Sequence, residues 1–214
     1  MNTDPVVFFR EDFPELFNRG VAALRADADG GDAKAQAQLD DTSAAKGAVH
    51  VLFEGDGGGE LWLSVAGGAM KVLDEAPDDV PVRMGVAAPV EAAKAALEEV
   101  ENADLLAHDK APIRIARSAS AETEKLLEGH VLEFHLTFKD LPADPDEVTL
   151  RIGIGVGDPP AEPKFTAAVS WDDIEDVRDG ELTPQQLFGR LKLTGDATQA
   201  MALGMSLMQR AQQR

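Results

Sequence analysis

The sequence contains no cysteine, which excludes disulfide bonds, zinc–thiolate sites and thiol nucleophiles. Positive charge is also scarce, with 20 Lys and Arg residues against 39 Asp and Glu residues and a net charge of −19. No run of Lys or Arg interrupts this acidity. We therefore expect no nucleic-acid partner and no adsorption to an anionic membrane, because both require clustered cations. A large negative net charge of this kind is typical of a soluble protein, because repulsion between like charges prevents association.

Long apolar segments and targeting signals are absent as well. No apolar run approaches the roughly 18 residues that are needed to span a bilayer. The first residues, MNTDPVVFFRED, lack a basic segment followed by an apolar stretch, so no signal peptide is predicted. We expect a cytoplasmic protein without stable membrane insertion.

The patterns that would indicate an active site are also missing. GDGGG at 55–59 leads into a strand instead of a helix, so it predicts a hairpin turn and not a phosphate loop. GIGVG at 153–157 has the wrong spacing for a dinucleotide fingerprint. No nucleophile-elbow sequence occurs. The histidines show no metal-ligand spacing, and we expect structural or solvent-facing roles for His50, His108, His130 and His135. The sequence therefore predicts no enzyme, no cofactor and no metal.

What the sequence does contain is a series of strands interrupted by helices. Apolar residues at helical spacing predict a helix over 12–28, and 32–47 predicts either a second helix or a linker. Segregated strands and helices indicate an α+β fold, with an antiparallel or mixed sheet that helices cover. Alternation and turn residues predict strands at 48–55, 60–68, 69–75, 80–88, 111–118, 130–140, 146–158, 163–170 and 190–194. Helix-forming stretches follow at 89–104, 120–129, 171–180 and 197–214.

The order of these elements is repeated along the chain. Both 48–129 and 130–214 read as strands, a helix, a short strand and a final helix. We therefore predict two related halves after a helical N-terminal segment at 1–47, the first half being degenerate.

The stretch LTPQQLFGRLKLTGD, residues 182–196, contains several local signals. Thr183 is a good N-cap, Pro184 suits the first helical position, and Gln186 completes a capping box. Gly189 is predicted to end this helix, and Gly195 to turn the chain from a short strand into the last helix.

Residues 165–208 resemble the C-terminal part of the sterol carrier protein 2 family. The resemblance rests on a strand ending in Ser, an acidic helix, a Pro-Gln pair before an aromatic residue and Gly, a short strand, Gly-Asp and an apolar helix. The matching positions are Ser170, Asp173, Gly180, Pro184, Gln185, Phe188, Gly189, Leu191, Lys192, Leu193, Gly195 and Asp196. The resemblance implies noncatalytic binding, or transfer, of a lipid or another long apolar molecule.

The last helix has more apolar surface than one sheet can cover. Its apolar residues span roughly 200° of the circumference, whereas a helix on a sheet needs about 100°. The excess predicts contact with a ligand cavity, with the other half or with a partner chain. In the second and third cases the protein has a structural or interaction role, such as a homodimer. If the excess faces a ligand cavity, the predicted lining residues are Trp171, Ile174, Leu187, Phe188, Leu191, Met201, Met205 and Met208.

Overall fold

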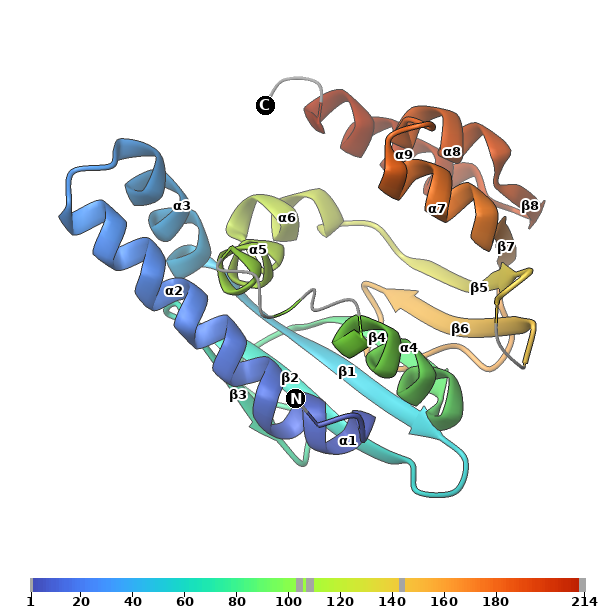
Figure 1. The fold of residues 1–214 in the computed structure, drawn as a ribbon, viewed down its shortest axis with the longest axis horizontal. Coiled ribbons are helices and arrows are strands. Elements are labelled where there is room, and N and C mark those ends of the chain that lie inside the picture. The colour runs from blue at the N-terminus through green and yellow to red at the C-terminus, as the bar shows by residue number, and fades with distance from the viewer. Residues whose placement is uncertain (1, 103–105, 107–109, 143–144, 212–214) are drawn as a thin grey trace.

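A computed structural model of the chain describes residues 2–102, 106, 110–142 and 145–211. Eight strands within these ranges form one mixed sheet in the order β3-β2-β1-β4-β6-β5-β7-β8. The α+β architecture with a mixed sheet is therefore confirmed (Figure 1). The strands are β1 (Lys46–Glu54), β2 (Gly59–Ala66), β3 (Ala69–Leu73), β4 (Val82–Pro89), β5 (Leu132–Lys139), β6 (Glu147–Ile154), β7 (Phe165–Ser170) and β8 (Lys192–Gly195).

Separate groups of helices lie at the two ends of the sheet (Figure 1). Helices α2 and α3 lie at the β1–β3 end, whereas α7, α8 and α9 lie together near β7 and β8. In the part of the chain described here, no helix is long and apolar enough to cross a membrane. The helices are α1 (Pro5–Val7), the π-helix η1 (Phe8–Asp12), α2 (Phe13–Asp29), α3 (Ala33–Ala44), α4 (Val90–Asn102), α5 (Ala111–Ser118), α6 (Ala121–Leu127), α7 (Trp171–Asp179), α8 (Pro184–Arg190) and α9 (Thr198–Ala211).

The larger hydrophobic core belongs to the N-terminal part of the chain. It joins α2 and α3 to strands β1–β3, and it contains the fully buried side chains of Phe17, Leu24 and Leu61. Each of these residues stabilises the fold by roughly 1.5–3 kcal/mol through its burial.

The strand pairings follow one pattern in the two predicted halves. Strand β1 forms an antiparallel hairpin with β2 and pairs in parallel with β4. Strand β5 likewise forms an antiparallel hairpin with β6 and pairs in parallel with β7. The two groups of strands meet where β4 pairs antiparallel with β6, so that the sheet is continuous. The division into two related halves stays a prediction.

The strand predicted at 111–118 is wrong, because these residues form helix α5. The alternation of Ile113 and Ile115 fits a strand, but Pro112 occupies the first helical turn, where a missing N–H does no harm. The helix packs against α2 at Gly20, where an added Cβ would lie 2.0 Å from the carbonyl oxygen of Pro112. Ala116 is completely buried in the same contact region. Tertiary packing therefore overrode an ambiguous short pattern.

The stretch 182–196 folds largely as expected. The capping box is present, since the backbone N–H of Thr183 donates to Gln186 Oε1 at 2.8 Å and the N–H of Gln186 donates to Thr183 Oγ1 at 3.3 Å. Gly195 has a φ of 93°, as a turn into α9 requires. The prediction for Gly189 is wrong. It lies inside α8, which continues to Arg190, because the capping box and the following Leu191 set the helix ends instead.

Candidate functional site

The floor of the site is one face of the C-terminal part of the sheet. Residues directly opposite one another on paired strands share a face. The pairings Leu132 with Ile154 and Phe134 with Phe165 therefore place these four side chains together. The rings of Phe134 and Phe165 are stacked, with their centroids 4.9 Å apart. Strands β5, β6, β7 and β8 consequently present a continuous apolar surface on this side.

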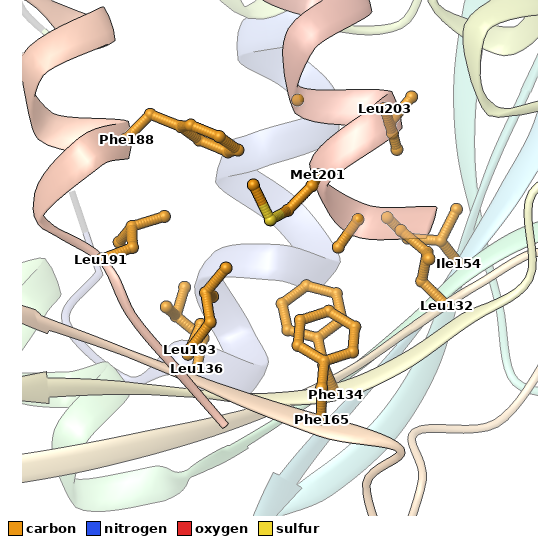
Figure 2. Close-up of a pocket in the computed structure, with 13 residues that line it drawn as sticks. Leu132, Phe134, Leu136, Ile154, Phe165, Phe188, Leu191, Leu193, Met201 and Leu203 are labelled. Carbon is orange, nitrogen blue, oxygen red and sulfur yellow. The ribbon is translucent and has the colours of Figure 1, made fainter. Parts of the chain in front are cut away.

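Helices α8 and α9 form the opposite wall. Phe188 of α8 lies against Gly204 of α9, where an added Cβ would be 2.5 Å from a ring carbon of Phe188. A side chain at 204 would therefore have to displace the ring of Phe188. Helix α8 is also fastened to α7 by an ion pair between Arg190 and Asp173. Figure 2 shows Phe188 pointing from α8 toward α9, with Met201 lying between Phe188 and the rings of Phe134 and Phe165.

Between this floor and this wall lies a cavity of about 230 Å³. None of its lining side chains carries a polar or charged group. Met201 lines the cavity and is also 45% exposed, so it stands where the cavity opens to solvent. The lining residues are Leu132, Phe134, Leu136, Ile154, Phe165, Ala167, Phe188, Leu191, Leu193, Ala200, Met201, Leu203 and Gly204 (Figure 2).

The structure brings some of the predicted lining residues together and not others. Phe188, Leu191 and Met201 line the cavity. A further four of the predicted residues are not in its lining: Trp171, Ile174, Leu187 and Met205. The side chain of Met208 lies outside the described residues.

The absence of Met205 from the lining has a plain cause in the orientation of α9. The helical signals predicted an apolar arc but not which part of it would face the sheet. Met205 lies on the uncovered part of that arc and is 53% exposed. The sequence predicted that a cavity would lie between the last helix and the sheet of 131–169, but it named no sheet residue in the lining. The alternation of Leu132, Phe134 and Leu136 in one strand was a signal that could have found them.

This lining limits the chemistry that the cavity can perform. It contains no titratable side chain that could transfer a proton and no nucleophile. Among the residues the structure describes, no group of three or more His, Asp or Glu side chains could hold a metal ion. Burial of apolar surface is therefore the interaction that this cavity offers to a ligand.

A second buried arrangement surrounds His50, whose exposed fraction is 4%. Its Nδ1 lies 3.0 Å from the carbonyl oxygen of Gly157, and its Nε2 lies 2.9 Å from Glu60 Oε1. The imidazole also stacks on Trp62 at 4.4 Å. Gly157 belongs to the loop between β6 and β7, so His50 fastens this loop to β1. The arrangement has a structural explanation and lines no cavity described here.

The sequence model of the SCP-2 sterol transfer family matches residues 114–208. This match confirms the resemblance, which was strongest over 165–208 and looser over the hairpin at 131–158, and it extends the resemblance to residue 114, within α5. Every residue that lines the cavity falls within the matched region. No curated protein and no solved structure matches the chain.

Proposed function

We propose, from the match of residues 114–208 to the SCP-2 sterol transfer family, that this protein binds a lipid or another long apolar molecule without catalysis. The family points to lipid binding or transfer. We place the ligand in the cavity under α8 and α9, and assign its contacts to the floor and wall residues described above. The observation that carries the proposal is a cavity that opens to solvent and yet has a wholly apolar lining.

The size of the cavity sets the affinity to be expected. If a methylene group is taken to need about the volume of a water molecule in the liquid, roughly 30 Å³, the cavity of about 230 Å³ accepts about eight such groups. Each contributes about 0.8 kcal/mol on burial, or about 6 kcal/mol in all. The lost freedom of the ligand must be subtracted from this sum, so for the part of a ligand inside the cavity we expect a dissociation constant no tighter than tens of micromolar. A longer chain would extend past Met201 and gain additional burial against exposed α9 surface.

The test is titration with N-phenyl-1-naphthylamine, an uncharged dye whose fluorescence rises in apolar surroundings. We expect saturable binding to the parent protein. Ala200 lines the cavity, whereas Ala202 lies on the exposed side of the same helix. Ala200→Glu should therefore abolish binding, because an unpaired carboxylate beside an apolar ligand is strongly unfavourable. Ala202→Glu adds the same charge to the same helix and should leave binding intact.

Circular dichroism of both variants shows whether α9 still folds. Equal loss of binding in two folded variants would contradict the assigned site, and no dye binding by the parent would contradict the proposed function.

A second function is favoured by the exposed methionines of α9. Met205, at 53% exposure, does not contribute to the cavity, so the helix presents apolar surface that a second copy of the chain could cover. In that case the protein would be a homodimer or an interaction module. Native mass spectrometry separates the two functions: bound lipid on a monomer supports the carrier, and a clean dimer supports the interaction role.

A further inference from the structure

We infer that the cavity selects uncharged aliphatic molecules, such as long-chain alcohols, over anionic lipids of the same chain length. This inference rests on the proposed function and narrows its ligand class. The first observation is the lining itself, in which no side chain can donate a hydrogen bond to a carboxylate or phosphate. An anionic headgroup buried there would lose its hydration without compensation. It would therefore have to stay at the opening, beside Met201.

The helix that carries Met201 at the opening offers no positive charge up to Met208 either. From Thr198 to Met208, helix α9 has no charged residue. Its N-terminal turn, where an anion could otherwise bind, is already occupied by a carboxylate of the chain. The backbone N–H of Thr198 donates to Asp196 Oδ1 at 3.2 Å. A second anion would meet repulsion from Asp196 at this position.

The strands and α8, which line the cavity, also carry Lys and Arg residues. Those that the structure describes are not placed to bind a headgroup in the cavity. Lys192 lies between the lining residues Leu191 and Leu193, so the alternation of β8 directs it away from the cavity. Arg190 is paired with Asp173.

The same holds for β5 and β6. Lys139 pairs with Glu147 at 3.2 Å, and Arg151 pairs with Glu54 at 2.7 Å. Both cations belong to the sheet face opposite the cavity, because Lys139 differs from Leu136 by an odd number of residues and Arg151 is opposite His135.

The net charge of the whole chain also disfavours binding of an anion, and it acts over a longer range. Its net charge of −19 repels an approaching anion, and this repulsion weakens when salt shortens the Debye length from about 30 Å at 0.01 M to about 3 Å at 1 M. The affinity for the anion should therefore rise with ionic strength, whereas the affinity for the alcohol should not depend on it.

The experiment is displacement of N-phenyl-1-naphthylamine from the full-length protein by 1-decanol and by decanoate at pH 8. We expect 1-decanol to displace the dye at a concentration at least about tenfold lower than decanoate does at low salt. In 0.5 M NaCl the difference should narrow because decanoate improves. Decanoate that equals or surpasses 1-decanol at low salt would overturn the inference while leaving the proposed function standing. Failure of the dye and of both compounds to bind would overturn the proposed function itself.

A pair of variants tests the role of the opening. Met201→Lys places a cation at the opening, and Met205→Lys places one farther along α9, outside the lining. We expect Met201→Lys to weaken 1-decanol, which loses part of the apolar wall, and to shift the ratio of the two displacing concentrations at least about fivefold in favour of decanoate. Met205→Lys should change both much less. An equal shift of this ratio in both variants would show that net charge alone governs selectivity, and it would overturn the assignment to the opening.

Discussion

Filling the cavity from the sheet side gives the sharpest test of how much room it offers to a ligand. Ala167 lies on β7, is 4% exposed, and directs its methyl group into the cavity. In Ala167→Leu, three additional carbon groups would occupy this space. A cavity that exists accepts them, whereas a site that is already packed forces its neighbours apart at a cost of about 1–3 kcal/mol.

The expected gain in stability follows from two independent quantities. Three buried carbon groups contribute about 2.4 kcal/mol at 0.8 kcal/mol each. Alternatively, filling about a third of the 230 Å³ cavity at roughly 24 cal/mol per Å³ gives about 1.8 kcal/mol. Restricting the new leucine rotamer offsets roughly 0.5–1 kcal/mol of this. We therefore expect the free energy of unfolding to rise by about 1–1.5 kcal/mol.

Binding should change in the opposite direction. The leucine takes the place of about three methylenes of ligand, so the dye and 1-decanol should bind about 50-fold more weakly. Ala168→Leu is the matched control, because Ala168 pairs with Lys192 on the other face of β7 and does not line the cavity.

Urea unfolding measures the stability term, and dye titration measures the binding term. A variant Ala167→Leu that is less stable than the parent by more than 1 kcal/mol would refute the reasoning, since the leucine would have found no room. Unchanged dye binding in a stabilised variant would place the ligand elsewhere.

Three further outcomes are expected. Gly195→Ala should lower the free energy of unfolding by about 1–3 kcal/mol, because φ is 93° at Gly195. Gly189→Ala should raise the free energy of unfolding by about 0.5–1 kcal/mol, because Gly189 lies in a helix with open space around it. Urea unfolding of both variants measures these changes. His50→Ala should destabilise by about 2–4 kcal/mol in the same assay, and a smaller loss would contradict its fastening role. A hydrogen bond from the Thr198 side chain lowers the pKa of Asp196. Its stabilising contribution is therefore present above the ordinary carboxyl pKa and lost as pH falls through the folded value. Thr198→Val should raise that pKa in an NMR titration.

The sequence determined the local elements of the C-terminal region well. The capping box at Thr183 and the positive φ of Gly195 depend on residues within a few positions of one another, and both are present. The family resemblance rested on the same contiguous stretch and is confirmed by the match to 114–208. These features could be predicted because short-range hydrogen bonds and steric limits act within the same segment.

Tertiary packing decided what the local patterns left open. The Ile113–Ile115 alternation became a helix because α2 offers close contact at Gly20. It also decided which side of α9 faces the sheet, covering Leu203 and leaving Met205 exposed. The physical reason is the same in both places. An apolar side chain specifies that it should be buried, but hydrophobic burial has no direction, and only the arrangement of neighbouring elements determines which surface covers it.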